Sequence, residues 1–159
     1  MTIVLKGIRG ILSLAQVGIA VGMIVVVAVK LSNITVDLGL LNLDVTYRCL
    51  LGPSYHSNTI CRYSYVACGL SLAASIGTAI VQLVSLDCCG VASLVDLCVG
   101  FGGGIWWMIA AAVITNKASN VNDGGLNLQN WRDLVIAMAW AEVALFLLVA
   151  LTALLGFCL

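Results

Sequence analysis

Four long apolar stretches run through this chain, and each is long enough to cross a membrane. A helix needs about 20 residues to span a hydrocarbon core about 30 Å thick. The stretches lie at about 11–29, 65–86, 91–115 and 134–159, and the longer loops between them at 30–64 and 116–133. Helices joined by short links pack antiparallel. The pattern therefore predicts an all-α fold, an integral membrane four-helix antiparallel bundle that forms a single domain over 1–159.

The composition supports a membrane protein and excludes a nucleic-acid-binding one. Hydrophobic residues make up 62% of the chain and charged residues only 9%, whereas soluble proteins carry about 25% charged residues. Seven Lys and Arg balance seven Asp and Glu, so the concentrated basic surface that phosphate binding needs is lacking. We expect the partners to be membrane lipids and either other integral membrane proteins or further copies of this chain.

The first apolar stretch could instead be a signal peptide, because Lys6 and Arg9 precede it. It is longer than the usual apolar region of about 7–15 residues, and no small-x-small cleavage site precedes Lys30. Four spans are therefore predicted.

The orientation in the membrane is indicated by two conflicting patterns. The side that holds both termini has two Lys and Arg residues, Lys6 and Arg9, and the side of the two longer loops has five, Lys30, Arg48, Arg62, Lys117 and Arg132. This count favours long loops in the cytosol. The cysteines favour the opposite. Cys49, Cys61 and Cys68 form a disulfide-capable group if the first loop is extracytosolic, and Cys88 and Cys89 at a membrane edge suit palmitoylation from the cytosol. We expect cytosolic termini, in the plasma membrane or an endomembrane.

A few polar residues fall within the spans, where each needs a partner or a function. In an antiparallel bundle, Arg9, Gln82 and Asp96 lie at the same membrane side, and Gln16 follows Arg9 on nearly the same helix face. We predict an Arg9–Asp96 ion pair that fixes helix register, with a proton or ion relay as the alternative.

Glu142 falls near mid-depth of the fourth span, with no basic residue at a comparable depth. It could be protonated, bonded to Gln16 or to a Ser or Thr, or paired with another subunit. A solvated transport site needs several such groups.

Small residues recur every four positions in three spans. In lipid, this spacing lets helix backbones approach closely. The candidate packing positions are Gly18, Gly22, Gly69, Ala73, Gly77, Gly100 and Gly104. The neighbouring Trp106 and Trp107 lie mid-span, where they are expected to pack against a helix, a pigment or a sterol rather than at the interface.

The residues that common enzymes and metal sites require are scarce. His56 is the single histidine and has no carboxylate or Cys at a metal-ligand spacing. Neither a metal site nor a Ser-His-Asp arrangement can be assembled from the sequence. We expect no catalytic residues, no metal, no cofactor and no enzymatic activity.

The chain resembles the MARVEL-domain superfamily, including its Casparian-strip-membrane-protein-like branch. The resemblance rests on Arg9 and Gln16 in the first span, Asp96 and Trp106 in the third, and Asn130-Trp131-Arg132 to Trp140 in the fourth. It implies a four-helix membrane bundle with cytosolic termini, no enzymatic activity, and a role in membrane-domain scaffolding, vesicle trafficking or junction formation. The Arg and Asp of that branch would correspond to Arg9 and Asp96.

Three functions remain in competition. The first is a non-enzymatic scaffold or membrane-domain organiser that associates laterally with itself or other membrane proteins. The second is a small accessory subunit of a larger membrane complex. The third is an ion or solute transporter or channel subunit that uses Glu142.

Overall fold

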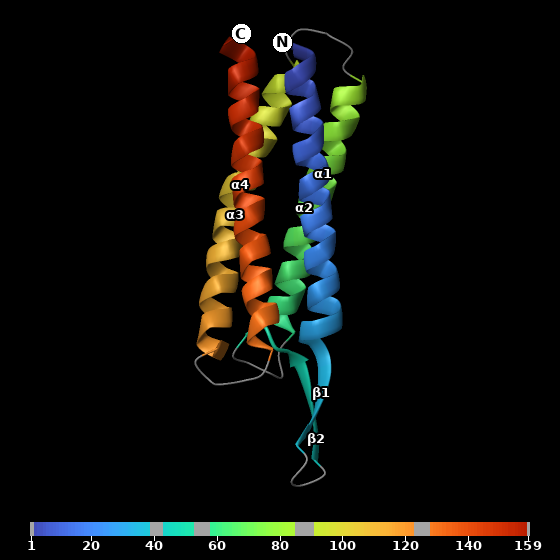
Figure 1. The fold of residues 1–159 in the computed structure, drawn as a ribbon, viewed down its shortest axis with the longest axis vertical. Coiled ribbons are helices and arrows are strands. Elements are labelled where there is room, and N and C mark those ends of the chain that lie inside the picture. The colour runs from blue at the N-terminus through green and yellow to red at the C-terminus, as the bar shows by residue number, and fades with distance from the viewer. Residues whose placement is uncertain (1, 39–42, 53–57, 85–90, 123–127, 159) are drawn as a thin grey trace.

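Four long helices pack side by side in the computed structural model, which describes residues 2–38, 43–52, 58–84, 91–122 and 128–158 (Figure 1). The helices are α1 (Thr2–Val26), α2 (Thr59–Val84), α3 (Val91–Asn122) and α4 (Gln129–Cys158). Successive helices alternate in direction, so both ends of the chain lie at one end of the bundle (Figure 1). The most extensive contact is between α3 and α4. The predicted four-helix bundle is confirmed.

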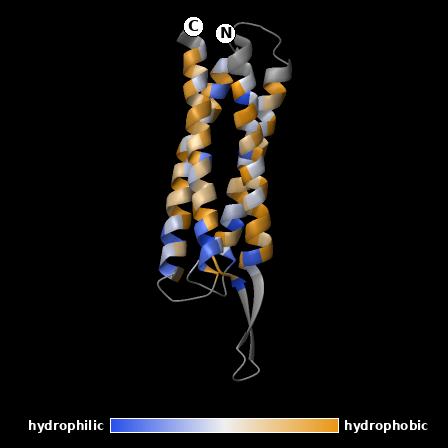
Figure 2. Ribbon diagram, in the orientation of Figure 1, coloured by the Kyte–Doolittle hydropathy of each residue, from blue (hydrophilic) through white to orange (hydrophobic). Residues whose placement is uncertain are grey.

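All four helices are long and apolar enough to cross a membrane. The candidate spans are Gly7–Leu31, Thr59–Val81, Ser93–Val121 and Gln129–Gly156. Large apolar side chains are exposed on their outer faces, including Ile11, Leu14, Ile76, Ile105 and Leu151. Polar residues gather at the helix ends opposite the termini, and apolar residues dominate the rest of the bundle (Figure 2). This distribution suits a lipid environment, because lipid solvates apolar side chains on the outside of a bundle.

The core of the bundle is filled by large side chains from three of the helices. Large apolar side chains that are fully or almost fully buried there include Met23, Trp107, Ile114, Val135 and Phe146. Polar side chains also lie in the interior, among them Arg9, Gln16, Asp96 and Glu142.

The helices are longer than the apolar stretches that predicted them. The first begins at Thr2, the second begins inside the expected first loop at Thr59, and the fourth begins inside the expected second loop at Gln129. The third continues to Asn122. The loop bounds 30–64 and 116–133 therefore differ from the structure. The physical reason is that a helix does not have to end where the hydrocarbon core ends, since its polar terminal turns are solvated in the interfacial region.

A β-hairpin follows the first span, where the sequence analysis expected only a loop. A short π-helical turn, η1 (Val27–Leu31), leads into β1 (Ser32–Leu38), which pairs antiparallel with β2 (Leu43–Cys49). The register runs from Ser32 opposite Cys49 to Leu38 opposite Leu43. The hairpin projects from the end of the bundle opposite the termini (Figure 1). Its two strands are rich in β-branched residues, which favour extended backbone.

Candidate functional site

A buried cluster around Arg9 joins three helices near the end of the bundle that holds the termini. Nη1 of Arg9 on α1 lies 3.1 Å from Oδ2 of Asp96 on α3 and 3.3 Å from Oγ of Ser93. Nη2 of Arg9 donates to the carbonyl oxygen of Thr152 on α4 at 2.8 Å. The side chains of Arg9 and Asp96 are only 8% and 2% exposed. One guanidinium therefore ties α1 to both α3 and α4.

Gly156 makes room for this guanidinium. A Cβ placed on Gly156 would lie 2.6 Å from Nη2 of Arg9 and 3.8 Å from Oγ of Ser93. The sequence indicated Arg9 and Asp96 as members of this cluster but not Ser93 and Gly156. Ser93 lies one turn before Asp96 and could have been found from that spacing, because residues three apart share a helix face.

The side chain of Gln82, which the sequence placed at this same membrane side, lies outside the described residues.

Glu142 lies at the centre of the fourth span and is completely buried. Its Oε2 accepts a hydrogen bond of 3.4 Å from the hydroxyl of Ser71 on α2. Its Oε1 has no hydrogen-bond partner within the described part of the chain. The sequence left open whether Glu142 is protonated, bonded to Gln16 or to a Ser or Thr, or paired with another subunit. In the structure it is hydrogen-bonded to a serine, Ser71. Gln16 is also buried at 3% exposure, and its Nε2 has no partner among the described residues.

The small residues divide into two groups. On α3, Gly100, Gly103 and Gly104 lie against α4, and a Cβ on Gly100 would come within 2.8 Å of the backbone nitrogen of Ala150. A Cβ on Gly104 would lie 3.2 Å from Cδ2 of Leu147, and one on Gly103 would clash with the Phe146 ring. These glycines permit the close α3–α4 approach.

The second group faces away from the bundle. A Cβ on Gly18, Gly69 or Gly77 would meet no atom of the described structure within 4 Å, and all three residues are exposed. Ala73, between the last two, is exposed as well. Gly22 is intermediate, since its Cβ would lie 3.6 Å from Cε of Met138. The outer side of α2 therefore carries a stripe of small residues, Gly69, Ala73 and Gly77, that the described part of the chain leaves exposed.

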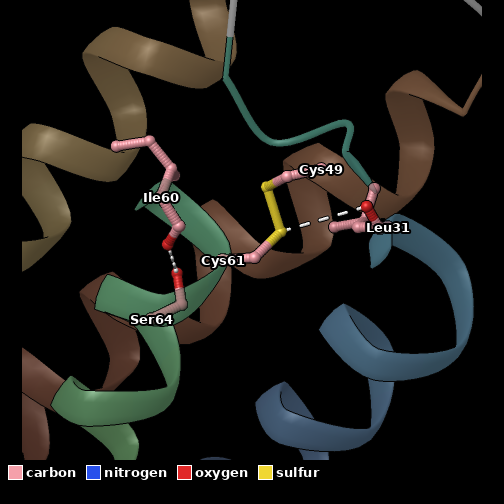
Figure 3. The surroundings of a disulfide bond; sticks show 5 residues. All are labelled: Leu31, Cys49, Ile60, Cys61 and Ser64. Atoms are coloured by element: carbon pink, nitrogen blue, oxygen red, sulfur yellow. Dashed lines mark hydrogen bonds between the residues drawn. A yellow bond between two sulfur atoms is a disulfide. The ribbon is translucent and has the colours of Figure 1, made fainter. Parts of the chain in front are cut away.

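A disulfide joins Cys49 at the end of β2 to Cys61 in the first turn of α2 (Figure 3). The bond closes a sequence separation of 12 residues, and both cysteines are buried. The backbone nitrogen of Leu50 donates to the carbonyl of Leu31 at 2.8 Å. Sγ of Cys61 lies 3.9 Å from that same carbonyl oxygen (Figure 3), but this is a van der Waals contact because a disulfide sulfur carries no proton.

The other candidate cysteines are not part of this disulfide. Cys68 is a free, buried thiol on α2 whose sulfur lies 3.3 Å from Sδ of Met23. The disulfide-capable group is thereby narrowed to Cys49 and Cys61, since Cys68 lies two turns into a helix that packs it against α1. Cys88 and Cys89 lie outside the described residues.

Cationic and aromatic residues meet at the hairpin end of the bundle. Nζ of Lys30 lies 5.2 Å from the centre of a Trp131 ring, a cation–π contact. Nε1 of Trp140 donates to Oγ1 of Thr115 at 3.2 Å. Arg132, which the sequence analysis counted as a loop charge, is fully buried. The sequence did not predict this burial, because an arginine at the start of the fourth apolar stretch is equally compatible with an exposed loop.

Metal ligands do not gather in the part of the chain that the structure describes, where no three His, Cys, Asp or Glu side chains come together.

These features define the class of the protein as an integral membrane protein with four candidate spans packed as a helical bundle. No protein-family model, no curated protein and no solved structure matches this chain.

Proposed function

We propose that this protein is a non-enzymatic membrane scaffold or membrane-domain organiser, which associates laterally with copies of itself or with other membrane proteins. The observation that carries the proposal is the outward stripe of Gly69, Ala73 and Gly77 on α2. Small residues four apart let a second helix approach closely, and dispersion between the backbones then holds the pair together in lipid.

The two groups of glycines support this interpretation by contrast. Gly100 and Gly104 are already covered by α4 of the same chain, whereas the α2 stripe is not. Elsewhere on the outer surface, large side chains such as Leu14, Val21 and Val25 on α1 face lipid. A stripe that lacks such side chains is suited to a helix partner. The resemblance of Arg9, Gln16 and Asp96 to the MARVEL-domain superfamily supports the same function.

We also propose that the hairpin is extracytosolic and both termini are cytosolic. Disulfides persist in oxidising compartments, and the Cys49–Cys61 bond lies at the hairpin end. The Lys and Arg count favoured the opposite orientation. Two of those five cations interact within the protein. Lys30 stacks on Trp131, and Arg132 is buried.

Association is tested with donor- and acceptor-labelled copies of the protein in phospholipid vesicles, read by energy transfer at rising dilution in lipid. The variant Gly69→Leu/Gly77→Leu covers the stripe with large side chains and should lower the apparent association constant at least tenfold. The matched control is Gly18→Leu, also at an exposed glycine with free space around it, and it should associate as the wild type does.

The outcome distinguishes the competing functions. Wild-type energy transfer that Gly69→Leu/Gly77→Leu leaves unchanged would refute the stripe as the contact. A detergent-solubilised particle of fixed stoichiometry with other chains, and no transfer between copies, would favour the accessory-subunit function instead.

Orientation is tested with a membrane-impermeant maleimide on sealed cells, before and after treatment with an impermeant reductant. We expect Cys49 and Cys61 to be labelled only after reduction. Labelling of both without reduction from the cytosolic side would contradict the proposed orientation.

A further inference from the structure

The hairpin of β1 and β2 has one apolar and one polar face. Successive residues of a strand belong to opposite faces of a sheet. The residues of one face are apolar, and the register pairs them across the strands as Ile34 with Tyr47, Val36 with Val45, and Leu38 with Leu43. The positions between them are polar, with Thr35 opposite Thr46 and Asp37 opposite Asp44. This alternation is typical of a sheet that has one face packed and the other in water.

Neither the helices nor the lipid reach most of this apolar face. The hairpin begins at Ser32, directly after the span Gly7–Leu31, and extends away from the ends of the helices (Figure 1). Each strand has seven residues, a length of about 23 Å at about 3.3 Å per residue. The polar layer of a bilayer is only about 5–8 Å thick on each side. The outer part of the hairpin therefore lies in water.

The hairpin by itself lacks the support that two strands need in water. An isolated two-stranded hairpin is marginally stable at best, and a further strand or a packed layer is required for stability. Asp37 and Asp44 add a penalty, because they are directly opposite each other in the register and like charges in such a pair repel. A partner that packs on the apolar face would supply the missing stabilisation.

The disulfide determines which partner comes close to this face. Cys49 at the end of β2 is bonded to Cys61 on α2, so the hairpin is tied to the helix that carries the stripe of Gly69, Ala73 and Gly77. Two copies that pair through this stripe lie in one membrane with the same orientation. Closed dimers are related by a two-fold axis, which here runs along the membrane normal. The two hairpins then lie side by side and point in the same direction.

We propose that the apolar faces of two such hairpins pack against each other and form a small β-sandwich outside the membrane, between two copies of this chain. This proposal rests on the lateral association through α2 proposed above. Sheets that pack face to face lie about 10 Å apart, with their strands within about 30° of each other. Two hairpins that both run along the membrane normal satisfy this geometry, and their polar faces remain on the outside of the sandwich.

The test uses the energy-transfer assay between labelled copies in phospholipid vesicles. Val36→Lys/Val45→Lys places two positive charges in the apolar face and should lower the apparent association constant at least tenfold. The matched control is Thr35→Lys/Thr46→Lys, which adds the same two charges at the neighbouring cross-strand pair of the polar face, and it should associate as the wild type does. The lysines are directly opposite each other in both variants, so any weakening of the hairpin itself is common to both.

The results separate this contact from the association through α2. Equal association constants for the two lysine variants would overturn the proposal, and a hairpin that binds a different protein would give this result. If Gly69→Leu/Gly77→Leu still lowers association in that case, the scaffold function stands and only the hairpin contact fails. Wild-type protein that shows no energy transfer between copies would overturn both proposals.

Discussion

The guanidinium of Arg9 on α1 lies 3.1 Å from the carboxylate of Asp96 on α3, although 87 positions separate the two residues in sequence. The same guanidinium donates to the backbone carbonyl of Thr152 on α4. A buried charge without a partner is costly, and here its partners belong to two different helices. The cluster therefore fixes the relative heights of three of the four helices.

Asp96→Asn should lower the stability of the bundle. The substitution leaves Arg9 buried with a neutral neighbour, and removal of one partner from a buried ion pair costs about 3–5 kcal/mol in soluble proteins. We expect a loss at the lower end of that range, about 3 kcal/mol, because Thr152 and Ser93 still bind the guanidinium. The measurement is thermal unfolding in detergent.

The double variant Arg9→Gln/Asp96→Asn is the matched control for this prediction. It removes both charges, so it should be more stable than Asp96→Asn alone, and the difference gives the coupling between the pair. Additive losses from the two single variants would contradict a direct interaction.

The pairing of Arg9 with Asp96 could be predicted because topology alone brings the relevant ends together. The start of the first span and the start of the third lie on the same membrane side in any antiparallel bundle, and few charged side chains are present there. The partner of Glu142 could not be predicted in the same way. Serines occur on α1, α2 and α3, and the choice of Ser71 depends on how far α2 is rotated about its axis.

The same limit applies to the glycines. A four-residue spacing marks a helix face, but it does not show whether the covering helix belongs to the same chain. Gly100 packs on α4 whereas Gly69 and Gly77 face outward, although the spacing in each case is the same. The hairpin was missed for a different reason, since the length of the apolar stretches carries no information about the residues between them.

Gly100→Ala should destabilise the protein. Its added Cβ would lie 2.8 Å from the backbone nitrogen of Ala150 and 3.0 Å from the Cα of that residue. Backbone atoms of a packed helix cannot move aside independently, so α3 and α4 must separate, and overpacking of this kind costs about 1–3 kcal/mol. The control Gly18→Ala adds the same methyl group where no atom lies within 4 Å. It should be neutral or slightly stabilising, because alanine favours a helix more than glycine does. A loss for Gly100→Ala that is no larger than the loss for Gly18→Ala would contradict the packing argument.

Reduction of the Cys49–Cys61 disulfide should loosen the hairpin end. The bond closes a loop over a separation of 12 residues, for which the entropy of the unfolded chain predicts a contribution of about 3 kcal/mol. Cys49→Ser/Cys61→Ser should therefore unfold at a lower temperature than the wild type and should not respond to reductant. Cys98→Ser replaces an exposed free cysteine and should keep both the wild-type midpoint and its sensitivity to reductant. A wild-type midpoint that reductant does not change would contradict this prediction.

Glu142→Gln distinguishes a structural carboxyl from a transport site. An amide oxygen can accept the hydrogen bond from Ser71 as the carboxyl does, and interhelical hydrogen bonds in membranes contribute only about 0.6 kcal/mol on average. We therefore expect Glu142→Gln to keep the wild-type unfolding midpoint. A transport path needs several polar groups in a solvated cavity, whereas Glu142 is completely buried with Ser71 as its hydrogen-bond donor. Proton flux into vesicles should therefore be the same for the wild type, the variant and protein-free vesicles. A wild-type flux that Glu142→Gln removes would contradict the scaffold function and establish the carboxyl as part of a proton path.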